Sequence, residues 1–191
     1  MKYYLKLGFV LLIITIIASG VLAYINSITK PIIEKNQRKT KEEARLEVLP
    51  SAVTFDSISY FNDEVVYTGK NEKGEIVGYT FVASLYGYSG DVKSMIGVTP
   101  ELAVNKIKII EQKETPGLGA NCQKQEFQKQ FENKIKSSMM VDKDGGEIIS
   151  ITGATITTRT IANSIKTGLA MLEEITSELE ELTSDKEEKV K

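Results

Sequence analysis

The chain has 191 residues, enough for one ordinary domain with an appendage but not for two large domains. Its 24 Lys and Arg residues against 26 Asp and Glu residues give a formal net charge of −2, so nucleic acid is not an expected partner. The lack of histidine excludes Ser-His-Asp and Cys-His catalytic groups and every metal site with a histidine ligand. A single cysteine, Cys122, excludes an internal disulfide, and its thiol is expected to be a core or surface group without a redox role.

The N-terminal region predicts a membrane-spanning helix. From Leu7 to Ile25 there are 19 consecutive uncharged residues. As a helix this stretch is roughly 28 Å long, close to the thickness of the hydrocarbon core of a bilayer. A cleaved signal peptide is the alternative, but its apolar region is usually shorter and ends in an Ala-x-Ala-like site, of which this stretch has no good example. We therefore expect a short flank over 1–6 and an uncleaved anchor over 7–25.

The charges around this span leave its orientation open. More Lys and Arg residues follow the span, over 30–45, than precede it, and this excess taken alone favours a cytoplasmic C-terminal domain. Long domains also cross the membrane regardless of flanking charge. Residues 26–50 form a charge-dense connector, predicted to be helical and to end at Pro50.

The rest of the chain predicts one mixed α+β domain over 51–175 and an acidic tail over 176–191. Runs of β-branched and aromatic residues predict strands at 65–67, 76–86, 95–98 and 107–110, with turns at Gly69 and at 71–74. Phe127, Phe131 and Ile135 recur at four-residue spacing and predict a short amphipathic helix. Residues 148–151 predict a buried strand, and a longer helix follows, with one apolar face between residues 161 and 179.

Three glycine-bearing segments, 85–91, 113–119 and 152–158, are candidates for a binding site, although turn chemistry alone also explains each of them. The third has the strongest physical case. Gly153 and Ala154 allow a ligand to approach the backbone closely. If the next helix begins near Thr157 or Thr158, its free N–H groups and positive dipole end face Thr155. A phosphate is stabilised there without a cationic side chain, so the residues alone predict an anion site.

Together these segments resemble the hallmarks of the FMN-binding domain family. Thr-Gly-Ala-Thr at 152–155 resembles the family's flavinylation motif, Glu-Thr-Pro-Gly-Leu-Gly at 114–119 resembles its second hallmark, and Tyr-Gly-Tyr-Ser-Gly at 86–90 resembles its aromatic-glycine turn. The three segments occur in family order behind one N-terminal span, so the resemblance covers nearly the whole chain. Within the family, the chain is most similar to the subunits that serve Rnf-type ion-translocating electron transport complexes.

The resemblance implies that Thr155 carries FMN through a phosphoester bond, made by a separate flavin transferase with FAD as donor. It also implies a membrane-anchored carrier, without independent catalysis, that relays electrons among the membrane subunits of a Rnf-type ferredoxin:NAD oxidoreductase coupled to Na⁺ or H⁺ export. The flavin domain is then on the outer face of the cell membrane. The expected FMN-binding residues are Tyr88, Ser89, Thr115, Gly117, Leu118, Gly119, Thr152, Gly153, Ala154 and Thr155, and no metal site is expected.

Four positions depart from the family's pattern. Ile149 stands where members commonly carry Asp, Gln112 where a His often precedes the second hallmark, and 120–121 read Ala-Asn instead of Asp-Lys. None of these removes the acceptor hydroxyl of Thr155, and Ile149 bears on recognition by the transferase. Two other functions remain open: a membrane-tethered flavin domain of another electron-transfer chain, and a non-redox anchored assembly module that keeps the fold without FMN.

Overall fold

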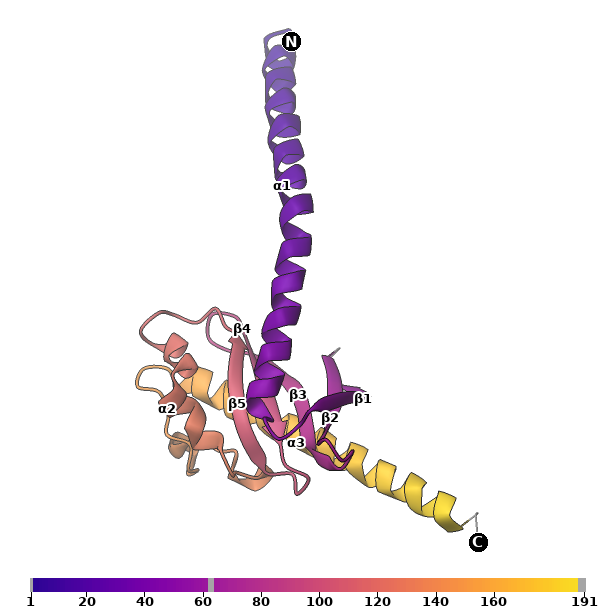
Figure 1. Cartoon of the computed structure of the whole chain (residues 1–191). Coiled ribbons are helices and arrows are strands. Elements are labelled where there is room, and N and C mark those ends of the chain that lie inside the picture. The colour runs from indigo at the N-terminus through magenta and orange to yellow at the C-terminus, as the bar shows by residue number, and fades with distance from the viewer. Residues whose placement is uncertain (1, 62–63, 189–191) are drawn as a thin grey trace. The chain divides into compact units, whose positions relative to one another are not determined.

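The computed structural model describes residues 2–61 and 64–188, which fall into two units, Met1–Thr40 and Lys41–Lys191 (Figure 1). The first unit is the greater part of α1 (Lys2–Val48), a continuous helix that enters the second unit with its last two turns. Its most apolar 18-residue window has a mean hydropathy of 2.5 and buries nothing. By length and composition, α1 can therefore cross a membrane. The predicted helical connector is confirmed up to Val48.

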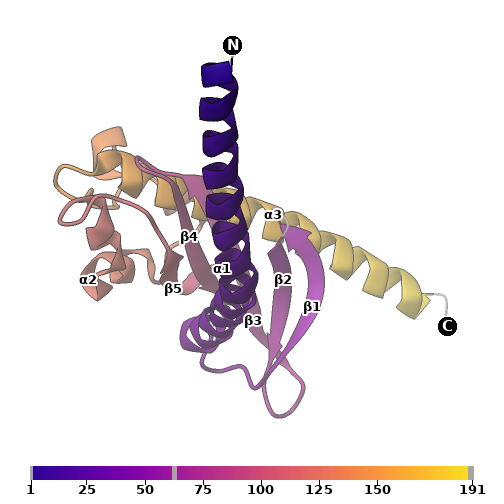
Figure 2. The same ribbon diagram turned by 90° about the horizontal axis from the view of Figure 1, so that it is seen from above.

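The second unit is built on an antiparallel sheet of five strands in the order β1-β2-β3-β4-β5 (Figure 2). The strands are β1 (Thr54–Phe61), β2 (Glu64–Lys70), β3 (Ile76–Tyr86), β4 (Asp91–Val98) and β5 (Val104–Glu111). The strands predicted at 76–86, 95–98 and 107–110 are confirmed. The predicted turn at Gly69 is wrong, because Gly69 pairs with Gly78 inside the sheet and β2 continues to Lys70.

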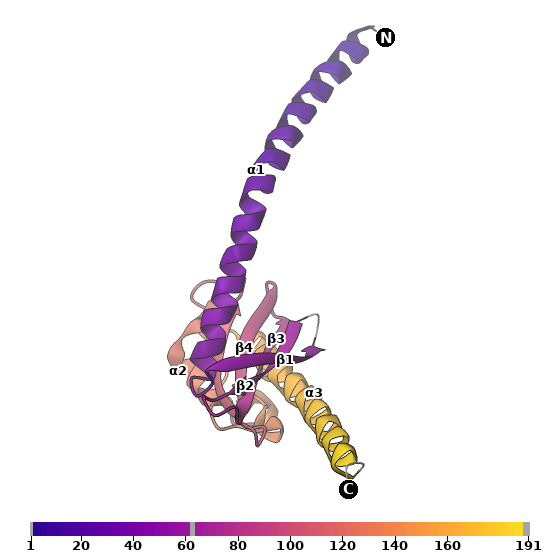
Figure 3. The same ribbon diagram turned by 45° about the vertical axis from the view of Figure 1, so that its right-hand side comes forward.

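Helices cover both faces of this sheet. The long helix α3 (Thr155–Glu188) packs on one face of the sheet (Figure 3). The packing is so close that a Cβ atom at Gly168 would overlap the ring of Phe81. On the other face, the end of α1 packs against Val82 and Met95, and a Cβ atom at Gly97 would overlap the backbone of Val48. The sheet is therefore buried on both sides over β3 and β4, which lead directly to the turn that carries Tyr88.

The amphipathic helix predicted at the C-terminus is confirmed as α3. Its apolar face is buried at Ile161, Ile165, Leu169 and Leu172. The helix begins at Thr155, two or three residues earlier than predicted, because its first intrahelical hydrogen bond already runs from the Thr158 N–H to the Ala154 carbonyl. It continues to Glu188, into the stretch where the sequence predicts an acidic tail.

Between β5 and α3 the chain forms loops and short helical turns. The only α-helix among the described residues of this segment is α2 (Gln125–Gln128), and 3-10 turns lie at Gly119–Gln123, Lys129–Phe131, Lys136–Ser138 and Asp142–Asp144. The predicted helix through Phe127, Phe131 and Ile135 is wrong beyond Phe131. Glu132 is extended and Asn133 has a φ of 60°, so the helical path stops and Ile135 is exposed.

The predicted buried strand over 148–151 is also wrong. Only Ile148 is paired, in an isolated bridge with Val141, and the side chain of Ile149 is 67% exposed. The backbone of Ile149 is held instead by a side chain, because its N–H donates to the Gln130 amide oxygen at 2.8 Å. This segment is therefore a surface loop that leads into α3.

Candidate functional site

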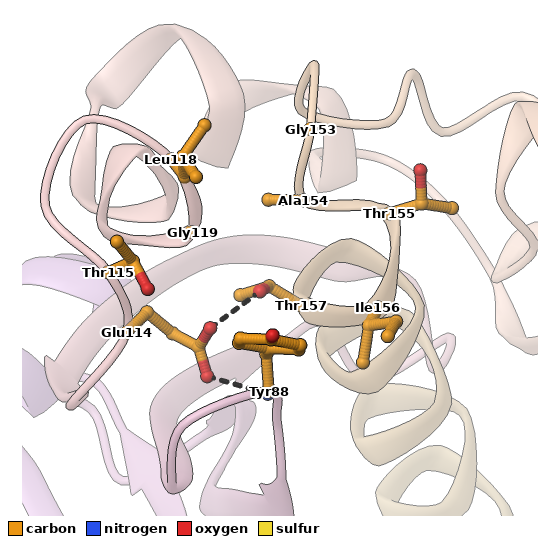
Figure 4. A pocket seen from close by; sticks show the side chains of 10 residues that line it. All are labelled: Tyr88, Glu114, Thr115, Leu118, Gly119, Gly153, Ala154, Thr155, Ile156 and Thr157. Carbon is orange, nitrogen blue, oxygen red and sulfur yellow. Dashed lines mark hydrogen bonds between the residues drawn. The ribbon is translucent and has the colours of Figure 1, made fainter.

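A cavity of about 460 Å³ lies where the β3–β4 turn, the loop after β5 and the loop before α3 meet the first turn of α3 (Figure 4). Its volume falls in the range of about 300–1,000 Å³ that is typical of pockets for small molecules and cofactors. The lining residues are Tyr88, Glu114, Thr115, Leu118, Gly119, Gly153, Ala154, Thr155, Ile156 and Thr157.

Seven of the ten residues proposed from the sequence line this cavity, and the other three do not. Gly117 and Thr152 line a neighbouring cavity of about 720 Å³, which shares Leu118 with the first and also includes the exposed Ile149. Ser89 lines neither of them, but its N–H donates to the carboxylate of Glu114 at 3.2 Å. The three glycine-bearing segments are therefore brought together at one place, as the motifs predict.

Two glycines shape the loops on either side of Leu118. Gly117 has a φ of +79° and Gly153 a φ of +76°, in the left-handed region that glycine adopts readily and other residues seldom do. A Cβ atom at Gly153 would also lie 3.1 Å from the Leu118 side chain. The two loops consequently approach each other closely, with Leu118 between the two cavities.

Glu114 joins three parts of the cavity wall. Its side chain is buried, at 5% exposure. One carboxylate oxygen accepts hydrogen bonds from the N–H groups of Tyr88, at 2.8 Å, and Ser89, at 3.2 Å. The other oxygen accepts a hydrogen bond from the Thr157 hydroxyl at 2.8 Å (Figure 4). This carboxylate therefore links the β3–β4 turn, the loop after β5 and α3.

Glu114, Ile156 and Thr157 also line the cavity, although the motifs predicted no binding role for them. For Thr157, the sequence did contain a signal of a buried, hydrogen-bonded hydroxyl. Three threonines in the first turns of α3 are buried and act as ties: Thr157 to Glu114, Thr158 to the Ile151 N–H at 3.1 Å, and Thr160 to the Tyr86 carbonyl at 3.2 Å. Threonine is a modest helix former, so a cluster of it on a face that must be buried indicates hydroxyls with partners.

The first turn of α3 presents backbone donors at the edge of the cavity. The N–H groups of Thr155, Ile156 and Thr157 precede the first intrahelical hydrogen bond, so they have no partner within the helix. Thr155 is half-buried, and its hydroxyl points away from Glu114 (Figure 4). Among the described residues that line the cavity none is Lys or Arg, so the helix end supplies the positive potential there.

An exposed ion pair fixes the loop before α3 to the helix. The Arg159 guanidinium donates to both carboxylate oxygens of Asp144, at 2.7 and 2.8 Å. These hydrogen bonds lower the pKa of Asp144 below its usual value. In the same loop, a hydrogen bond from the Ser150 hydroxyl lowers the pKa of Asp142. The loop that carries Thr152 and Gly153 is thus tied to α3 through Asp144 and to itself between Asp142 and Ser150.

The single cysteine is expected to be unreactive in the native chain. Burial, followed by the negative charge of Glu114, raises the pKa of the Cys122 thiol to about 11 from 9.0. At pH 8, we expect alkylation by iodoacetamide to be at least tenfold slower for native than for urea-unfolded chain, because both access and thiolate are lost. As the pH rises from 9 towards 11, the thiol ionises in the unfolded chain before it does so in the native chain. This rise in pH therefore lowers the free energy of unfolding. Equal native and unfolded rates would contradict the burial.

The second unit is an α+β domain with a cofactor-sized pocket at the N-terminus of a long helix. Residues 87–170 match the FMN-binding domain family, and residues 2–48 match the RnfG N-terminal region. Among solved structures, the C subunit of the Na⁺-translocating NADH-quinone reductase of Parabacteroides distasonis has a similar fold. Its TM-score is 0.56 at 17% identity, covering 74% of this chain and 94% of that one.

Relatives of similar length narrow the assignment. The G subunit of the Na⁺-translocating ferredoxin:NAD⁺ oxidoreductase complex of Acetobacterium woodii is 32% identical over 196 residues, covering 91% of this chain and 94% of the relative. The G subunit of the proton-translocating ferredoxin:NAD⁺ oxidoreductase complex of Clostridium ljungdahlii is 30% identical, covering 81% of this chain and 84% of the relative. The chain belongs to this family of RnfG proteins, which confirms the resemblance read from the motifs.

Proposed function

We propose that this chain is a membrane-anchored electron carrier of a Rnf-type ferredoxin:NAD oxidoreductase that translocates ions, and that its FMN is joined to Thr155 by a phosphoester bond. The observation that carries the proposal is the place of Thr155. It is the first residue of α3, half-buried in the cavity wall, where the free N–H groups of the helix end converge. It is also the last residue of the Thr-Gly-Ala-Thr segment.

The residues of the cavity suit FMN. Leu118, Ile156 and Tyr88 offer apolar and aromatic surface to a flat ring system. The absence of side-chain bulk at Gly153 lets a phosphate reach the backbone, and the N–H groups at the start of α3 stabilise its negative charge. When bound, FMN supplies the electron-transfer chemistry, and the chain binds and orients it and tunes its environment.

The attachment reaction needs FAD and a flavin transferase, which we propose as a maturation partner. A bond forms between the Thr155 hydroxyl oxygen and the FMN phosphorus of FAD. The pyrophosphate bond breaks, AMP leaves, and the hydroxyl proton goes to solvent. The diester that results has one negative charge, which suits the N-terminus of α3. Ile149 is 67% exposed, so its side chain is available to a transferase that binds this loop.

We also propose that α1 crosses the cell membrane once over 7–25, with the connector over 26–50, the flavin domain over 51–175 and the tail over 176–191 on the outer face. The length and apolar composition of α1 support the single crossing, as does the match of 2–48 to the RnfG N-terminal region. The outer face is what the resemblance to the family implies. The other membrane subunits of the complex, which the names of the relatives describe, are the expected partners.

The proposal is tested in membranes that contain the whole complex. We expect Thr155→Val to abolish ferredoxin-dependent NAD⁺ reduction while leaving the amount of assembled complex unchanged. Thr167→Val is the matched control, because that threonine is exposed on α3 and its hydroxyl donates to the Asn163 carbonyl of its own helix. Full activity of Thr155→Val in an assembled complex, with no flavin on this chain, would refute the carrier role and favour a non-redox assembly module.

A further inference from the structure

Glu114 is the acidic side chain among the described residues that line the cavity, and its charge has no cationic partner there. Within 2–61 and 64–188 it receives three hydrogen bonds and takes part in no ion pair. Two of the three donors are backbone N–H groups and the third is a hydroxyl. An ionised carboxylate is an acceptor only, and each of its two oxygens has a donor here although no counter-charge neutralises it.

The site is built to accommodate this carboxylate. A Cβ atom at Gly87 would overlap one of its oxygens, and a Cβ atom at Gly119 would lie 2.6 Å from the other. The carboxylate is therefore enclosed by two glycines that leave it room, one in the β3–β4 turn and one in the loop after β5. Its charge is also felt inside the domain, since it is one of the causes that raise the pKa of the Cys122 thiol.

We propose that Glu114 is a positioning residue that holds the β3–β4 turn against the start of α3 and whose fixed negative charge makes the flavin in this cavity harder to reduce. This inference rests on the proposed function. Reduction brings electrons from the donor and protons from solvent to the flavin, and a negative charge nearby opposes the arrival of electrons. The opposition is strong because the carboxylate is buried, where charges are poorly screened.

The test is the midpoint potential of the covalently bound flavin in the full-length chain, measured by dithionite titration and flavin absorbance. Glu114→Gln removes the charge and keeps the shape. The amide oxygen still accepts from Tyr88 and Ser89, and the amide NH₂ donates to the Thr157 hydroxyl. We expect the equilibrium constant for reduction to rise at least tenfold, which is about 30 mV for a two-electron couple.

Two variants separate charge from shape. Glu126→Gln removes the same charge from an exposed residue of the neighbouring cavity, and we expect no shift because solvent screens it. Thr157→Val breaks the tie between Glu114 and α3 and leaves the charge in place, so we expect the potential to stay at or below that of the wild type. This second expectation holds independently of whether Glu114→Gln folds.

An unchanged potential in Glu114→Gln would overturn the inference, as would a rise in Thr157→Val equal to that in Glu114→Gln. Either result leaves the proposed function intact, because both are measured on a chain that carries its flavin. Failure of the wild-type chain to acquire covalent flavin contradicts the proposed function itself, so the two failures are distinguishable.

Discussion

Thr155→Val is expected to yield a folded chain with no covalent flavin. Valine has the shape of threonine but lacks the oxygen that must bond to phosphorus, so no amount of transferase compensates. Because Thr155 is the first residue of α3, a β-branched residue is already tolerated there and the fold should persist. The measurement is in-gel flavin fluorescence of denatured protein, with intact mass, after co-expression with a flavin transferase.

Thr155→Ser is the matched variant for this experiment. It restores the hydroxyl with one methyl group less, and we expect it to regain flavin. A fluorescent Thr155→Val chain would show that another hydroxyl of the segment, such as Thr152, is the acceptor. A non-fluorescent Thr155→Ser chain would show that the transferase requires the methyl group of threonine as well as its hydroxyl.

Gly119→Ala is expected to have the second largest effect. The added Cβ atom would lie 2.6 Å from a Glu114 oxygen and 2.7 Å from the Thr157 hydroxyl, so it forces apart a hydrogen-bonded pair that lines the cavity. Both neighbours are buried and held by each other, which leaves little room for relaxation. We expect a loss of about 1–3 kcal/mol in the free energy of unfolding, as for other overpacked sites, and flavin loading reduced to a small fraction.

Gly90→Ala is the matched control, because the atom nearest to its added Cβ would be the Lys113 Cβ at 3.3 Å, a contact that a small shift relieves. Urea unfolding of the flavin-free chains measures stability, and flavin fluorescence measures loading. If Gly119→Ala had the unfolding midpoint and loading of the wild type, the close packing around Glu114 would be wrong.

The two long helices were predictable from the sequence. The apolar run of α1 and the helical repeat of α3 extend over many turns, so local irregularities do not hide them. Strands β2 to β5 were located as well, but the two short elements predicted between β5 and α3 were not correct. The four-residue spacing of Phe127 and Phe131 brings their rings together edge to face, with the ring centroids 5.5 Å apart. This contact does not require the helix to continue past Phe131.

The site was partly predictable for a similar reason. Motifs identify loops whose backbone geometry is encoded locally, such as the turn at Gly153, and seven of the ten proposed residues line the cavity. The role of Glu114 depends on contacts across 26 residues to Tyr88 and 43 residues to Thr157. No local pattern states which turn lies opposite a given carboxylate, so only the fold reveals this tie.

The attachment of FMN to Thr155 is tested directly by locating the flavin on a peptide of the wild-type chain co-expressed with a flavin transferase. Trypsin cleaves after Lys143 and Arg159 and releases 144–159, which contains Thr155 together with four other hydroxyl residues. We predict that this peptide gains the mass of FMN minus water and that fragment ions place the gain on Thr155. An unmodified peptide, or FMN on any other residue, would contradict the central claim.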